Sequence, residues 1–130
     1  MRQNLLVTLT KEFAVDTIRL CGILKETKRA TVLSNQLLKS GTSIGANVHE
    51  ANYAASKSDF INKLQIALKE CYETAYWLEI FHEAEIVTQQ EYEGMYGKCS
   101  KIRAVLQASI ITAKKNLNKV NDFSWKGGRL

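Results

Sequence analysis

No proline occurs anywhere in the 130 residues of the chain. Proline interrupts a helix because its ring removes a backbone donor and clashes with the preceding turn, so its absence favours long, uninterrupted helices. Apolar residues recur at intervals of three and four throughout the sequence, which is the helical period, and no segment has the pattern of a strand. The sequence therefore predicts an all-α fold, and the length is sufficient for one domain with a core.

Four helical segments follow from this spacing. We expect the first over about residues 5–24 and the second over about residues 27–55. The third begins near Ser56, which has Asp59 three residues later in a cap-like arrangement, and the fourth follows the capping box that starts at Thr88. Short connections make consecutive helices antiparallel. The prediction is an antiparallel up-down-up-down four-helix bundle over residues 1–120, with a tail over 121–130.

Each segment has an apolar seam that is expected to face the core. The predicted seams are Leu9, Phe13, Leu20 and Leu24; Leu33, Leu37, Gly41, Ile44, Val48 and Ala51; Phe60, Leu64, Ala67, Cys71, Thr74, Leu78 and Phe81; and Tyr92, Cys99, Leu106, Ala113 and Val120, flanked by Met95, Ile102, Ile110 and Leu117. Phe123 and Trp125 could anchor the tail.

The cysteines and the apolar runs indicate the cellular compartment in which the chain is expected. Cys21, Cys71 and Cys99 are odd in number and widely spaced, which argues against a disulfide framework and a zinc site. We interpret them as small core residues of a cytoplasmic protein. The chain has no apolar run that could span a membrane and no secretory signal in residues 1–10.

Charge is distributed unevenly along the chain. Residues 1–49 carry 7 Lys/Arg and 3 Asp/Glu (net +4), residues 50–97 carry 3 and 9 (net −6), and residues 98–130 carry 8 and 1 (net +7). Such asymmetry indicates either an acidic partner such as nucleic acid or the association of unlike faces.

Small residues interrupt the second segment. Residues 43–51 read SIGANVHEA, and Gly41 lies one turn earlier. A glycine costs a helix interior about 1 kcal/mol relative to alanine, so a compensating contact is expected. Gly41 and Gly45 share one helical face, with Ser43 close by, and predict the close approach of a second backbone. A functional pocket is the alternative.

The same motif carries two polar neighbours, Asn47 and Glu50, which lie three residues apart on the helix. If they are buried, they must be hydrogen-bonded. The partner could be a backbone group, or it could be Lys69 or Glu73 of the third segment. Such a contact would fix the helix register.

Apolar residues wrap around the third segment beyond its seam, notably Tyr72, Tyr76, Trp77 and Ile80. Tyrosine and tryptophan are enriched in protein interfaces, and a contiguous exposed aromatic patch marks an interaction site. We expect these four residues to form a homo-oligomer interface. In the alternative, the tail or a neighbouring side chain covers them.

Lysines mark the fourth segment. Lys98, Lys101, Lys115 and Lys119 form one stripe away from the apolar seam, and Lys114 lies beside it. Three interpretations are open: a solvated helix face, contacts to phosphates, or contacts to the acidic third helix of a neighbouring subunit. No aromatic residues interleave with the lysines to stack bases, which argues against sequence-specific reading of single strands.

Motifs for catalysis and metal binding are incomplete. The zinc-protease motif begins at His49 but has Tyr53 where its second histidine is required. Glu79 and His82 form one ExxH pair, whereas di-iron bundles use two pairs and two further glutamates. Residues 41–45 lack the Gly-Lys-Ser/Thr of a phosphate loop. We expect no enzyme activity, metal or cofactor; a metal-dependent alternative would rest on Glu79 and His82.

Residues 43–50 (SIGANVHE), preceded by residues 33–37 (LSNQL), resemble the signature of a small bacterial family of four-helix bundles, the 23S ribosomal RNA intervening-sequence proteins. The resemblance extends over about residues 8–118. It continues with Phe60, Leu64, Ile66, Ala67, Leu68, Glu70, Glu73 and Leu78. The chain departs from many members at Ala51, where they have glycine, and this suggests that the second helix continues beyond it.

The resemblance implies an antiparallel bundle, commonly assembled as a ring of five, whose biochemical function is mostly unassigned. Some relatives are encoded inside ribosomal RNA genes. A more distant relative is a basic pentamer that binds a reverse transcriptase and nucleic acid. No catalytic residues carry over. We therefore expect a non-enzymatic oligomeric adaptor for RNA, DNA or a nucleic-acid enzyme, with a protein-interaction scaffold without a nucleic-acid role as the alternative.

Overall fold

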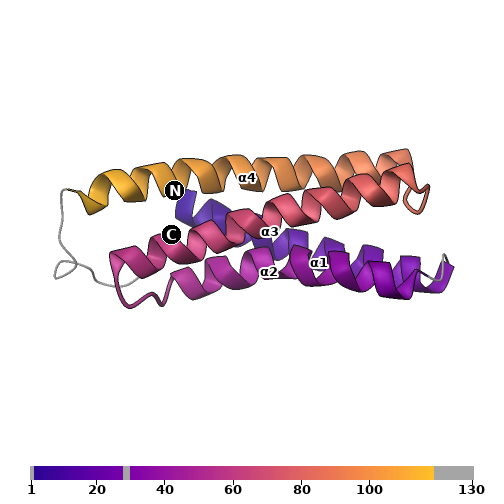
Figure 1. Cartoon of the computed structure of the whole chain (residues 1–130), viewed down its shortest axis with the longest axis horizontal. Helices are drawn as coiled ribbons and strands as arrows, with labels where there is room; N and C mark the ends of the chain where they lie inside the picture. The colour runs from indigo at the N-terminus through magenta and orange to yellow at the C-terminus, as the bar shows by residue number, and fades with distance from the viewer. Residues whose placement is uncertain (1, 28–29, 119–130) are drawn as a thin grey trace.

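The structure is a computed structural model that describes residues 2–27 and 30–118. These residues form four helices: α1 (Arg2–Thr27), α2 (Thr31–Ala51), α3 (Lys57–Glu83) and α4 (Gln89–Leu117). The helices lie along the same long axis (Figure 1). The predicted all-α four-helix bundle is therefore confirmed. The predicted boundary between bundle and tail, at residues 120 and 121, lies outside the described residues.

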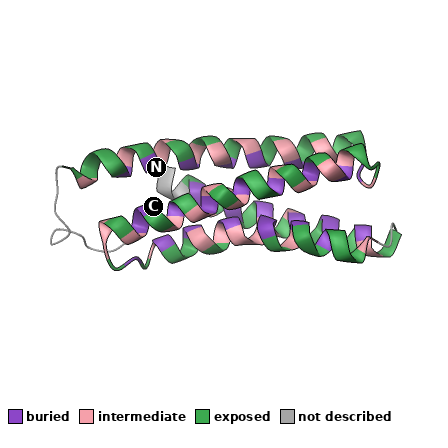
Figure 2. Cartoon of the chain, in the orientation of Figure 1, coloured by how far each residue is buried: buried purple, intermediate pink, exposed green. Residues whose placement is uncertain are grey.

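The helices pack in a ring in which α1 contacts α2, α2 contacts α3, α3 contacts α4, and α4 returns to α1. Helices α1 and α2 are antiparallel, since Thr10 lies against Gly45 and the later residue Thr17 lies against the earlier residue Gly41. Buried residues lie on the sides of the helices that face one another, and exposed residues lie on the outer sides (Figure 2). No helix in the described part of the chain is long and apolar enough to cross a membrane.

The two predicted N-terminal caps are confirmed. The Ser56 side chain accepts a hydrogen bond from the backbone N–H of Asp59 at 3.1 Å. Thr88 and Glu91 form a complete capping box at α4, in which each side chain accepts from the other residue's backbone N–H. These bonds satisfy donors that have no partner within the helix.

The predicted ends of α2 are wrong by several residues. The helix begins at Thr31 rather than 27, and it ends at Ala51 rather than continuing to Ala55. The backbone N–H groups of residues 52, 53 and 54 donate to the carbonyls three residues earlier, which tightens the chain into a turn. Ala54 is then buried in the core, so the connection to α3 is held in place.

Three predicted seams need correction. In α2, Leu33 is 38% exposed and its neighbour Ser34 is fully buried instead. In α1 Leu9 is only half-buried, as is Tyr92 in α4, and the predicted seam residue Val120 lies outside the described residues. The buried face of α1 includes two threonines, Thr10 and Thr17, that the apolar pattern passed over. Small residues replace large ones along α1 and α2 because the two helices approach each other closely there.

The three cysteines are free thiols, and all of them are buried as predicted. The thiol of Cys21 donates to the carbonyl of Ser34 at 3.4 Å, and burial raises its pKa to about 11. The thiol of Cys99 donates to the carbonyl of Cys71 at 3.5 Å, across the interface between α3 and α4. A hydrogen bond with Cys99 and burial raise the pKa of Cys71. All three therefore serve as core residues.

Candidate functional site

The glycines of the SIGANVHEA region lie against α1. A Cβ atom on Gly41 would come within 2.8 Å of Thr17 Cγ2, and a Cβ on Gly45 within 3.2 Å of the Thr10 carbonyl oxygen. Real Cβ atoms essentially never show the first of these distances. The two helix backbones thus approach as closely as they do because these positions carry no side chain.

The threonines that face the glycines have their hydroxyl groups satisfied within α1. Thr10 Oγ1 donates to the carbonyl of Leu6 and Thr17 Oγ1 donates to the carbonyl of Phe13, each at 2.7 Å. Buried hydroxyls need such partners. The seven-residue spacing of the two threonines, in helical register with Phe13, is a sequence signal that both lie on the core side of α1, but register alone does not show which helix they face.

The polar residues of the same region bond to backbone groups of α2 and not to side chains of α3. Ser43 Oγ donates to the carbonyl of Lys39 at 2.6 Å, and Asn47 Nδ2 donates to the carbonyl of Ser43 at 2.9 Å, all within α2. Glu50 is exposed, so no buried partner is required for it. Of the two kinds of partner expected for Asn47, the structure shows the backbone group, while neither Lys69 nor Glu73 bonds to Asn47 or Glu50.

A different pair joins α2 to α3. Thr74 Oγ1 donates to Ser40 Oγ at 3.0 Å, and both residues are buried. Ser40 Oγ in turn lies 3.3 Å from the carbonyl of Leu37, to which it donates.

Nearby on α3, burial raises the pKa of Glu70, and the negative charge of Glu73 adds to the effect.

The lysines of α4 differ in their surroundings. Lys98 forms an ion pair with Asp16 of α1 at 2.5 Å. Lys101, Lys114 and Lys115 are exposed. None of these three forms an ion pair with a carboxylate in the part of the chain that the structure describes. Lys119 lies outside that part.

The aromatic residues of α3 divide into two groups. Tyr72 is 49% exposed and turns toward α4, where its hydroxyl accepts from Gln107 at 3.0 Å and its ring lies 5.8 Å from the Arg103 guanidinium carbon. Tyr76 is 53% exposed, and its ring meets the Trp77 ring edge-on at 5.2 Å.

Trp77 and Ile80 are half-buried and pack against the core. The Trp77 indole Nε1 is buried, and no described residue accepts a hydrogen bond from it. A buried N–H without an acceptor is unfavourable, so an acceptor from outside the single chain would be stabilising at this position.

The single ExxH pair is used for contacts between α3 and the start of α4. Tyr96 donates its hydroxyl to Glu79 Oε1 at 3.2 Å, and this bond raises the tyrosine pKa. His82 Nε2 lies 2.5 Å from Gln89 Oε1, and the His82 ring stacks on the Tyr92 ring at 4.2 Å. Within the described residues, no group of three or more His, Cys, Asp or Glu side chains is placed to hold a metal ion.

Comparison with known proteins gives a family but no biochemical role. A crystal structure from Bacteroides thetaiotaomicron, of a protein of unknown function in the S23 ribosomal protein family, is similar at 43% identity and a TM-score of 0.84. The match covers 85% of this chain and 99% of that one. No match was found among curated proteins. The family model of the 23S rRNA-intervening sequence protein matches residues 2–108. The chain therefore belongs to the 23S rRNA-intervening sequence protein family.

Proposed function

We propose that the protein is a non-enzymatic, oligomeric adaptor that binds nucleic acid, or an enzyme acting on nucleic acid, in the cytoplasm. The observation that carries the proposal is the set of exposed cations on α4, namely Lys101, Lys114 and Lys115. A lysine without a carboxylate partner among the described residues is available to a phosphate, and phosphate contacts supply most of the affinity of non-specific nucleic-acid binding.

The spacing of the cations suits a backbone rather than a base sequence. Lys101 and Lys115 are fourteen residues apart on one helix, which corresponds to about 21 Å at 1.5 Å per residue. The exposed side chains between them include Ala104, Gln107 and Ile111, none of which is aromatic. Binding of this kind recognises charge and shape, and structured RNA is the ligand that we favour.

The test is a titration of a labelled structured RNA at two salt concentrations, with light scattering on the same samples. We expect binding that weakens steeply with salt. The variant Lys101→Ala/Lys115→Ala should reduce the slope of log affinity against log salt by about 1.5, because each phosphate contact contributes roughly 0.7 to 0.9.

The matched control is Lys11→Ala/Lys39→Ala, which removes the same two charges from α1 and α2. Its binding should remain close to that of the unaltered protein. Equal losses in the two variants would show that net charge alone controls binding, and absence of binding even at low salt would rule out the nucleic-acid role.

A protein-interaction scaffold is the second candidate, and the aromatic residues of α3 favour it. Tyr76 is exposed beside Trp77, whose indole N–H has no acceptor among the described residues. In this case the α4 lysines meet α3 glutamates of a neighbouring subunit, namely Glu70, Glu73, Glu79 or Glu83, of which all but Glu70 are exposed. A ring of five is the assembly that the family resemblance implies, and charge reversal at Lys101 and Lys115 would then dissociate it without unfolding the chain.

A further inference from the structure

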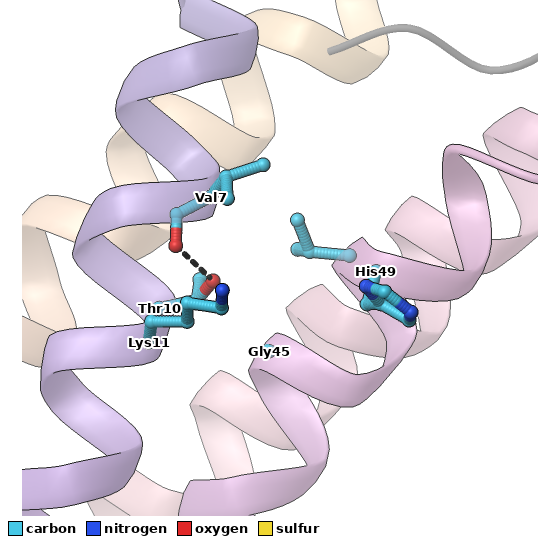
Figure 3. Close-up of a pocket in the computed structure, with 6 residues that line it drawn as sticks. Val7, Thr10, Lys11, Gly45 and His49 are labelled. Carbon is cyan, nitrogen blue, oxygen red and sulfur yellow. Dashed lines mark hydrogen bonds between the residues drawn. The ribbon is translucent and has the colours of Figure 1, made fainter.

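A cavity of about 120 Å³ lies between α1 and α2, at a site that neither proposed function uses. Its lining residues are Val7, Thr10 and Lys11 of α1, and Gly45, Val48 and His49 of α2. Figure 3 shows the labelled side chains of the two helices on opposite sides of the opening. The cavity therefore includes three residues of the SIGANVHEA region, Gly45, Val48 and His49.

The missing side chain of Gly45 contributes to the cavity. A Cβ at this position would lie 3.2 Å from the Thr10 carbonyl oxygen, so a larger residue would fill space between the helices. Val48 is buried and Val7 is half-buried, and they supply apolar walls. The Thr10 hydroxyl already donates to the carbonyl of Leu6. The inner surface is consequently apolar, with its polar groups satisfied.

The rim of the cavity has the opposite character. Lys11 and His49 are both exposed there, one from each helix. Lysine supplies a positive charge with three donors, and a histidine ring supplies at least one N–H donor in either tautomer. The His49 ring also lies against the Tyr53 ring, with 5.3 Å between centroids, which restricts its orientation. None of the described residues that line the cavity is acidic.

We propose that this cavity binds a small carboxylate with a branched or cyclic apolar tail. The tail would occupy the space over Gly45 between the two valines, and the carboxylate would accept hydrogen bonds from Lys11 and His49. The cavity size limits the tail to about four to six carbon atoms, because a cavity of about 150 Å³ holds one benzene molecule. Such a ligand contacts α1 and α2 together and would stabilise their packing by mass action.

Amide NMR spectra of the full chain during titration with isovalerate provide the test. The largest shifts should fall at Val7, Gly45 and Val48. Isovaleramide has the same shape without the charge, and it should bind about tenfold more weakly than isovalerate. Isovalerate should likewise bind the Lys11→Met variant about tenfold more weakly than the unaltered protein. The matched control is Lys39→Met, an exposed lysine of α2 that does not line the cavity, and its affinity should be unchanged.

The result that would overturn the proposal is the absence of shifts at Gly45 and Val48, or equal affinities for isovalerate and isovaleramide. Shifts spread over many lysines, with equal losses in Lys11→Met and Lys39→Met, would reduce the effect to general charge attraction and would also overturn it. Gly45→Ala should weaken binding, because its methyl group takes up part of the cavity. Because Lys11 is exposed, Lys11→Met keeps the test decisive if the glycine variant fails to fold. The outcome is independent of RNA binding, which is measured on the α4 variants.

Discussion

At the scale of single residues, the glycines of α2 differ from those of α4 in what surrounds them. An added Cβ on Gly41 meets Thr17 at 2.8 Å, whereas one on Gly94 meets nothing within 4 Å. We expect Gly41→Ala to lower the free energy of unfolding by about 1–3 kcal/mol through overpacking, despite its better helix propensity. Gly94→Ala should raise it by up to about 1 kcal/mol. Urea denaturation measures both.

Thr17 decides whether this explanation holds. Its side chain is fully buried, β-branched and bonded to the carbonyl of Phe13, so it cannot move aside at low cost. The double variant Gly41→Ala/Thr17→Ala should therefore lose less stability than the sum of the two single variants. Additive losses would mean that the contact between Gly41 and Thr17 is not the cause.

The close approach at Gly41 and Gly45 was predictable from their four-residue spacing, but its partner was not. An apolar pattern ranks side chains by size and hydrophobicity, so it selected Leu33 and Leu9 and passed over Ser34, Thr10 and Thr17. Two backbones in close contact leave room only for small residues. Which small residues are buried therefore depends on the neighbouring helix, and a single sequence does not specify that neighbour.

At the scale of the helices, the end of α3 depends on one residue with an unusual backbone conformation. The N–H of Ile86 donates to the carbonyl of Phe81 and that of Glu85 to the carbonyl of His82, which is the Schellman arrangement. Glu85 occupies its left-handed position, with φ of 59°. Glu85→Gly should raise the free energy of unfolding by about 0.5–1 kcal/mol, because glycine adopts this conformation without a steric cost.

Glu83→Gly is the matched control, since it makes the same substitution two residues earlier at the last helical position of α3. It should lower the free energy of unfolding, because helical glycine is unfavourable. Chemical denaturation of the two variants should therefore give opposite signs. A loss of stability in both would show that the left-handed position is not strained.

Helix starts and helix ends were not equally predictable. Ser56 and Thr88 begin α3 and α4 with side chains that accept from the backbone, and side-chain caps are visible in a sequence. α2 ends without a glycine by tightening into a turn over residues 52–54, and α3 ends on a glutamate in a glycine-like conformation. Because these ends are made by the backbone, the residue types gave no indication of where they lie.

At the scale of the whole molecule, the bundle leaves an aromatic surface on α3 that its own helices do not cover. Tyr76 is 53% exposed beside Trp77, while the Tyr72 side chain is engaged by Gln107 and Arg103 of α4. Tyr76 is thus the member of the predicted interface with the largest area available to another subunit. The sequence analysis predicted the four residues as one interface, and the structure divides them between contacts to α4 and open surface.

Tyr76→Glu should dissociate the proposed oligomer, because assembly would bury the new charge in an apolar contact, and burying an unpaired charge is strongly unfavourable. Light scattering should then report the mass of a single chain, with the helical circular dichroism retained. Tyr53→Glu makes the same change at a site that is 77% exposed on the turn after α2, and it should leave the mass unchanged. If Tyr76→Glu keeps the same mass as Tyr53→Glu, the interface does not include this face of α3. The indole N–H of Trp77 would then require a different acceptor.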